Sequence, residues 1–121
     1  MSEQVAWVWQ LSIKEGQYDN LIALMEEMIT ATKADEPGVL SYEWSVNGDQ
    51  TICHLYERYA DSAATLTHMG IFGSKFMKRF FGALRSTDMA VYGNPNDKVK
   101  EALASLKPTY MGSIGGFTRH G

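Results

Sequence analysis

One segment, from Glu36 to His68, constrains the fold more than any other part of this sequence. After a Pro-Gly pair, two runs rich in aromatic and aliphatic residues, Val39–Val46 and Gln50–Tyr59, flank the dipeptide Asn47-Gly48. Asn-Gly between two such runs is typical of a tight β-hairpin. The segment therefore predicts a hairpin that leads into a helix carrying His68.

The register of this hairpin decides which polar side chain shares a face with Tyr42 and Trp44. A two-residue turn pairs Tyr42 with Cys53 and puts Glu57 on the face of Tyr42 and Trp44. A three-residue turn pairs Tyr42 with His54, and His54 then replaces Glu57 on that face. The Asn-Gly signal favours the first register, and the sequence leaves both possible.

Hydrophobic periodicity on either side of the hairpin predicts two helices and two further strands. Together with the hairpin they follow the order strand, helix, strand, strand, helix, strand. This is the order of a ferredoxin-like α+β fold, an antiparallel sheet with two covering helices. The expected elements outside the hairpin are a strand at Val5–Ile13, a helix over Gln17–Lys33, a helix capped by Asp61 or Ser62 and interrupted near Gly70 and Gly73, and a strand at Thr87–Tyr92.

A chain of 121 residues has the length of one domain, so residues 1–121 are expected to form a single unit. Its core is expected at residues 5–93, and residues 94–121 form a C-terminal extension. In the extension, Asn94-Pro95 opens a short helix, and Tyr110–Phe117 is expected to be a glycine-rich edge strand.

Large side chains on the expected strands predict a homodimer. Two helices cover only one face of an antiparallel sheet, and seven large strand residues are not expected to share that face. The other face then exposes apolar surface, which usually marks an interface. Two sheets packed face to face would bury it. The seven residues are Trp7, Trp9, Tyr42, Trp44, Leu55, Tyr56 and Tyr59.

Charge and motif content exclude several classes of function. The net charge of −3 argues against a nucleic-acid partner. We expect no cofactor, because no GxGxxG motif follows a strand and the three histidines lack the spacing of a metal site. The single cysteine, Cys53, forms no intrachain disulfide, the N-terminus is unlike a signal peptide, and no apolar run spans a bilayer. We therefore expect a cytoplasmic protein with no membrane partner.

Three motifs together resemble the antibiotic biosynthesis monooxygenase family of dimeric α+β barrels, in particular its small quinol-oxygenase-like members. They are Glu36-Pro37-Gly38 before an aromatic strand, Tyr56-Glu57-Arg58-Tyr59 followed by Asp61-Ser62-Ala63-Ala64, and His68 in the helix. The resemblance covers residues 5–93, and the extension is similar to that of a longer subgroup. It implies a homodimer whose two sheets form a barrel, with a small-molecule pocket between sheet and helices in each subunit.

The resemblance implies a cofactor-independent monooxygenase that oxidises a phenol or quinol with dioxygen. His68 is then the expected base, because imidazole titrates near neutrality, and His54 is the alternative under the other register. Glu57 would orient the histidine or polarise the substrate hydroxyl, and Tyr42 and Trp44 would line the site of a small aromatic substrate. Two other functions stay open. They are a non-catalytic module that binds a small aromatic ligand, and a structural dimeric barrel of the stress-responsive type.

Overall fold

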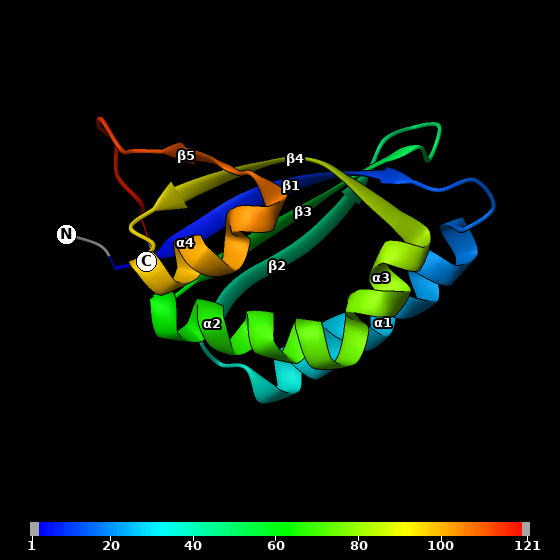
Figure 1. Ribbon diagram of the computed structural model, residues 1–121, viewed down its shortest axis with the longest axis horizontal. Helices are drawn as coiled ribbons and strands as arrows, with labels where there is room; N and C mark the ends of the chain where they lie inside the picture. Colours follow the sequence, from blue (N-terminus) through cyan, green and yellow to red (C-terminus); the bar gives the residue numbers. More distant parts are fainter. Residues whose placement is uncertain (1–2, 120–121) are drawn as a thin grey trace.

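A five-stranded sheet is the framework of the fold, and helices cover one of its faces (Figure 1). The computed structural model describes residues 3–119 of the chain. The elements are β1 (Val5–Ile13), α1 (Tyr18–Asp35), β2 (Val39–Val46), β3 (Ile52–Tyr59), α2 (Ser62–Ile71), the π-helical turn η1 (Phe72–Phe76), α3 (Met77–Ala83), β4 (Leu84–Gly93), α4 (Asp97–Leu103), the 3-10 turn η2 (Ala104–Leu106) and β5 (Thr109–Met111). The strand order is β2-β3-β1-β4-β5, with antiparallel pairing among the first four strands. This confirms the ferredoxin-like α+β fold.

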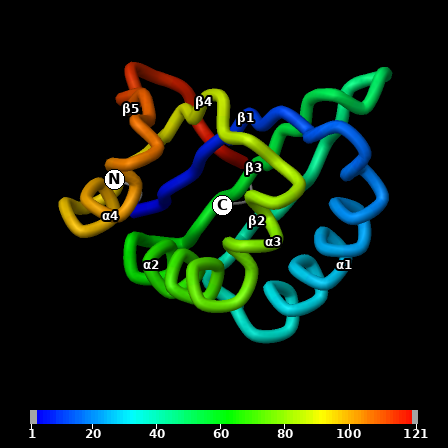
Figure 2. Tube along the Cα trace, turned by 45° about the vertical axis from the view of Figure 1, so that its right-hand side comes forward, coloured from blue at the N-terminus to red at the C-terminus, as the bar shows by residue number. Residues whose placement is uncertain are grey.

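The helices form one layer, with α1 at one end, α4 at the other and α2 and α3 between them (Figure 2). The expected break of the helix near Gly70 and Gly73 is instead a change in the type of helix. The π-helical turn η1 joins α2 directly to α3, and at this junction Phe76 departs from helical dihedral angles, with φ −122°. β4 begins at Leu84, three residues before the predicted start. Within residues 3–119, no helix is long and apolar enough to cross a bilayer.

The sheet register corrects the argument from the seven large strand residues. Trp7 lies opposite Glu57, which lies opposite Tyr42, and the next row joins Trp9, Leu55 and Trp44. Six of the seven residues therefore share the face under the helices, and Tyr56 alone points the other way. Trp7 and Trp9 are core residues, 3% and 5% exposed. The uncovered face carries smaller apolar side chains, including Val8 and Ala90, beside Tyr56.

The hairpin loop is longer than the Asn-Gly signal predicts. Val46 pairs with Cys53 and Tyr42 with Glu57, so the predicted pairing is wrong. The Asn47 N–H donates to the Ile52 carbonyl at 3.1 Å, which leaves four residues, 48–51, in the loop. The Asn47 side chain stabilises this loop, because its Oδ1 accepts hydrogen bonds from the backbone N–H groups of Thr51 and Ile52, both at 2.9 Å. A loop of four residues and a loop of two residues differ in length by an even number, so they place the same β3 side chains on the Tyr42 face. Glu57 therefore still lies on the Tyr42 face, as the favoured register predicted.

The C-terminal extension adds a short helix and a fifth strand. Asn96 caps α4, since its side chain accepts a hydrogen bond from the Val99 N–H at 3.0 Å. β5 pairs with β4 in parallel over three residues. The glycine-rich strand expected over Tyr110–Phe117 is limited to Thr109–Met111, and the following residues are exposed and irregular.

Candidate functional site

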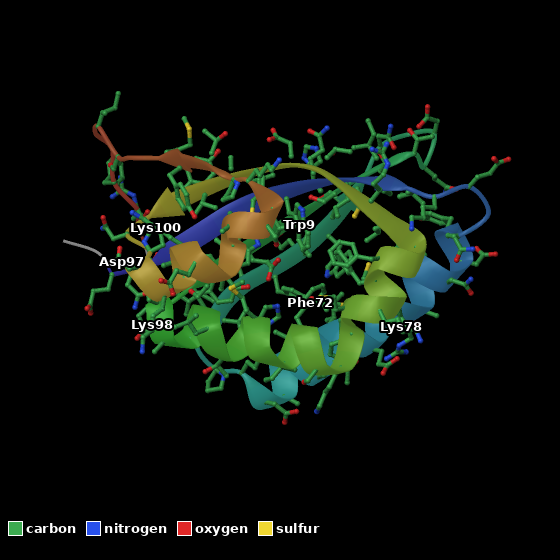
Figure 3. All side chains as sticks on the ribbon, viewed as in Figure 1. Trp9, Phe72, Lys78, Asp97, Lys98 and Lys100 are labelled. Carbon is green, nitrogen blue, oxygen red and sulfur yellow. The ribbon has the colours of Figure 1, made fainter. Side chains whose placement is uncertain are left out.

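A cavity of about 400 Å³ lies between the sheet and the helical layer. One row of sheet positions brings Trp7, Glu57 and Tyr42 to its polar end, where His68 of α2 also lines it. The remaining walls are almost entirely apolar. Trp9 from the sheet and Phe72 from η1 meet there, with ring centroids 6.2 Å apart (Figure 3). The cavity therefore suits a largely apolar molecule with one polar end.

His68 bridges two buried carboxylates at the polar end. Its Nδ1 lies 2.9 Å from Oε1 of Glu36, and its Nε2 lies 3.1 Å from Oε1 of Glu57. Glu36, Glu57 and His68 are 7%, 2% and 6% exposed. An ionised carboxylate only accepts hydrogen bonds, so both contacts are satisfied together when both ring nitrogens carry a proton. The geometry therefore favours an imidazolium between two carboxylates.

Glu57 accepts hydrogen bonds from three side chains. Trp7 donates its Nε1–H to Oε2 at 2.8 Å, and the Tyr59 hydroxyl donates to Oε1, which His68 also contacts. Such bonds stabilise a buried carboxylate in its ionised form. Glu57 is thus held in one orientation while it lines the cavity.

The charge state of the cluster follows from its surroundings. Burial lowers the pKa of His68, but the hydrogen bonds and negative charges of Glu57 and Glu36 outweigh it, so the pKa lies above the ordinary value of 6.5. Burial, followed by the charge of Glu57, raises the pKa of Tyr59 and Tyr42. Both phenols are therefore neutral near pH 7, and the direction of the His68 shift agrees with the imidazolium that the geometry favours.

Small residues bring α2 close enough to β2 to form this cluster. A Cβ atom added to Gly38 would lie 2.6 Å from the Cβ of Ala64, so this approach requires glycine. Asp61 caps α2 by accepting a hydrogen bond from the Ala64 N–H at 2.8 Å. One turn further along α2, His68 reaches Glu36, which directly follows α1. The Pro-Gly and Asp-Ser-Ala-Ala motifs therefore position the histidine.

The predicted site residues divide into two groups. Glu57, His68 and Tyr42 line the same cavity, and Tyr42 contacts His68 with ring centroids 5.5 Å apart. Trp44 lies behind them, against Tyr42 and Phe80, and is not part of the cavity wall.

The alternative base, His54, lies away from the cluster. It is exposed and pairs with Ser45 and Gln10 on the uncovered face of the sheet. The second register, which would bring His54 into the site, does not occur.

The sequence did not indicate three members of the cluster. In the sequence, Glu36 stands out only as part of a turn motif, and Trp7 and Tyr59 stand out only as large apolar residues. Alternation along β1 and β3 does place Trp7, Glu57 and Tyr59 on one face. A buried carboxylate needs partners, so two aromatic donors on the same face were the available signal.

Two buried polar atoms near the cluster are unsatisfied. Neither the Tyr42 hydroxyl nor the Trp44 Nε1 has a hydrogen-bond partner of normal geometry among the described residues. An unsatisfied buried group costs about 1–3 kcal/mol. Both atoms are almost completely buried, so neither is presented to a ligand in the cavity.

Replacing Glu36 with glutamine is expected to lower the pKa of His68, because it removes one of the two negative charges that favour the imidazolium. An NMR titration of the imidazole measures this directly. Glu26→Gln, an exposed position on α1, is the control and should leave the titration unchanged. An unchanged pKa in Glu36→Gln would contradict the bridging arrangement.

The same shift makes stability depend on pH. Since folding raises the pKa of His68, protonation stabilises the fold, fully below about pH 6.5 and progressively less as pH rises through the folded pKa. Glu36, Glu57, Tyr42 and Tyr59 also face the imidazole. In Glu36→Gln this contribution should be smaller and should be lost completely at a lower pH, because the folded pKa lies closer to the unfolded value.

Among residues 3–119, no group of three or more His, Cys, Asp or Glu side chains is arranged to hold a metal ion. The bridging imidazole explains this for the central cluster, since each carboxylate is directed at a ring nitrogen.

Comparison with known proteins identifies the family. The model of the antibiotic biosynthesis monooxygenase family matches residues 5–71, more than half of the chain. Among solved structures, MupZ from Pseudomonas fluorescens has a TM-score of 0.85 at 26% identity, and the match covers 98% of this chain and 97% of MupZ. Protein SO0527 from Shewanella oneidensis has a TM-score of 0.55 at 25% identity, covering 75% of this chain and 88% of that chain. Rv0793 from Mycobacterium tuberculosis has a TM-score of 0.57 at 23% identity, and the match covers 78% of this chain and 97% of Rv0793. No curated protein matches significantly. By the match to its family model, the chain belongs to the antibiotic biosynthesis monooxygenase family.

Proposed function

We propose that the protein is a cofactor-independent monooxygenase that oxidises a phenolic or quinol-type small aromatic substrate with dioxygen. One observation carries the proposal, namely that Glu57 and His68 form a charged pair at the end of an otherwise apolar cavity of about 400 Å³. An aromatic ring fits the apolar walls, and its hydroxyl group reaches the charged pair. Membership of the family supports the reaction class.

Glu57 is the proton acceptor in this proposal. Sequence reasoning favoured His68, but both nitrogens of His68 face carboxylates and have no free lone pair in the imidazolium form. A phenolic proton therefore passes to the Glu57 carboxylate. The imidazolium remains in place and stabilises the negative charge that develops on the substrate oxygen.

The electrons come from the substrate. The phenolate passes one electron to dioxygen, and the radical pair combines into a peroxide anion at a ring carbon. Protonated Glu57 returns its proton to give a hydroperoxide. Glu57 then takes the proton from the same ring carbon, the O–O bond breaks, and the departing hydroxide receives that proton. Phenol and dioxygen become quinone and water, so atoms and electrons balance without a separate reductant.

Desolvation and orientation are the other contributions of the protein. Trp9 and Phe72 exclude water from the ring, and Tyr42 forms the wall next to His68. A fixed pocket of this kind holds the reacting groups in one geometry. Trp44 supports Tyr42 from behind and does not contact the substrate.

Oxygen uptake tests this function. Protein checked to be free of metal and flavin is incubated with naphthols, anthrones and hydroquinones, and quinone formation is followed in parallel. The proposal expects one quinone for each dioxygen consumed with at least one of these substrates.

One observation favours a second candidate, a module that binds a small aromatic ligand without converting it. The carboxylate of Glu57 already accepts hydrogen bonds from Trp7, Tyr59 and His68, so the cluster is satisfied without a substrate. Thermal stabilisation by the same aromatic compounds, without oxygen uptake, would support this alternative. The polar cluster in the cavity argues against a purely structural barrel.

A homodimer formed through the uncovered sheet face is the assembly we propose. Val8→Asp should convert a dimer into a monomer in sedimentation equilibrium, because it places a charge between Tyr56 and Ala90 at the centre of that face. Ala23→Asp, on an exposed position of α1, should leave the dimer intact. A wild-type protein that is monomeric at micromolar concentration would contradict this assembly.

A further inference from the structure

One wall of the cavity comes from outside the part of the chain that the family model matches. We define the C-terminal segment as residues 94–111, which contain α4, η2 and β5. Four of its residues line the cavity, namely Ala102, Leu103, Ser105 and Leu106. The match to the family model ends at residue 71, so this wall lies outside the matched part of the chain.

The wall is attached at both of its ends. At the start, the backbone N–H of Asn94 donates to the Gln4 carbonyl at 3.1 Å, and that of Asn96 donates to the Ser62 hydroxyl at 3.0 Å. At the end, β5 pairs with β4. Between them, Val99 and Leu103 are completely buried. These contacts fix the segment as a rigid wall, unlike a loop attached at one point.

The comparisons differ in how much of this segment they include. The match with MupZ covers 98% of the chain and therefore includes the segment. The matches with SO0527 and Rv0793 cover 75% and 78%, too little to contain both the complete core and the complete segment. The match with MupZ therefore includes the segment, whereas the other two matches omit part of the segment or part of the core.

We propose that the C-terminal segment is the specificity wall of the cavity and that Leu106 limits the size of the bound ring system. The inference rests on the proposed function for the position of the ligand, whose hydroxyl group lies at Glu57. Leu103 is fully buried and serves the fold, whereas Leu106 is half-buried and borders the cavity. The side chain of Leu106 therefore limits the space available to the ligand without belonging to the fully buried core.

Binding of an apolar fluorescent probe tests the wall without relying on turnover. The probe is N-phenyl-1-naphthylamine, which has no acidic hydroxyl and whose emission rises in apolar surroundings. Leu106→Trp should raise its dissociation constant at least about tenfold, because added bulk occupies the cavity. The control is Ala104→Trp, an exposed residue of η2 outside the cavity wall, and it should change the constant by less than about twofold.

A second variant enlarges the cavity. Leu106→Ala should favour pyrene over N-phenyl-1-naphthylamine by about tenfold relative to the wild type. Circular dichroism checks that each variant is folded. Three results would each overturn the proposal. The first is an equal change of the dissociation constant in Leu106→Trp and Ala104→Trp, and the second is an unchanged preference between the two probes in Leu106→Ala. The third is that the wild type does not bind N-phenyl-1-naphthylamine. A protein that shows the expected binding pattern but no oxygen uptake would retain the wall and lose the proposed reaction.

Discussion

Replacing Glu57 with alanine is expected to lower the free energy of unfolding by about 3–5 kcal/mol, the usual cost of removing one partner from a buried ion pair. The variant leaves the imidazolium of His68 without one of its two carboxylates. It also removes the acceptor for the Trp7 Nε1–H and for the Tyr59 hydroxyl. Urea unfolding at fixed protein concentration and neutral pH measures the difference.

A control variant shows whether the loss of stability is specific to the buried Glu57 or follows from the loss of any glutamate side chain. Glu26 is exposed on α1, and Glu26→Ala should change the free energy of unfolding by less than about 0.5 kcal/mol. A change in Glu57→Ala as small as that of the control would mean that the cluster does not contribute to stability.

Replacing Glu57 with glutamine is expected to lower quinol oxidation by about 10²–10⁴-fold, the range in which general-base catalysis contributes. Glutamine keeps the shape of the side chain but does not accept a proton from the substrate. His68→Ala should cause a loss in the same range, because it removes the positive charge next to the substrate oxygen and the partner that orients Glu57. Oxygen uptake with the best wild-type substrate measures both.

His54 supplies the matched control for this prediction. It is the other histidine that sequence reasoning considered as a base, and it lies on the opposite face of the sheet. His54→Gln should retain wild-type oxygen uptake. Unchanged activity in Glu57→Gln would remove Glu57 from the mechanism.

The fold was predictable because its main signals are local. Alternation in β1, the three-and-four spacing in α1 and the Asn-Gly turn each depend on a few neighbouring residues. The exact hairpin pairing was not, because Asn47 can cap a four-residue loop with its side chain as well as form a two-residue turn. The predicted face of Glu57 is nevertheless correct, because shifting the strand pairing by an even number of residues keeps each side chain on the same face of the sheet.

The candidate site was predictable only in part, because contacts between distant elements assemble it. Glu57 and His68 were identified as residue types able to do the chemistry. Their ionisation state was not, because it depends on Glu36, which is 32 residues from His68 in the sequence. The cavity wall from the C-terminal segment was missed for the same reason, since the periodicity of α4 indicates burial and not the element it faces.

The most direct test of the account is whether Glu57 takes a proton from a bound phenol before oxygen reacts. 1-Naphthol is added to the wild type and to Glu57→Gln at pH 7 under strict exclusion of oxygen, and the absorption of the bound ligand is recorded. Naphtholate absorbs at longer wavelength than naphthol, so the spectrum reports the ionisation state. We expect bound naphtholate in the wild type and bound neutral naphthol in Glu57→Gln. Neutral naphthol bound to the wild type, or the same naphtholate fraction in both proteins, would contradict it.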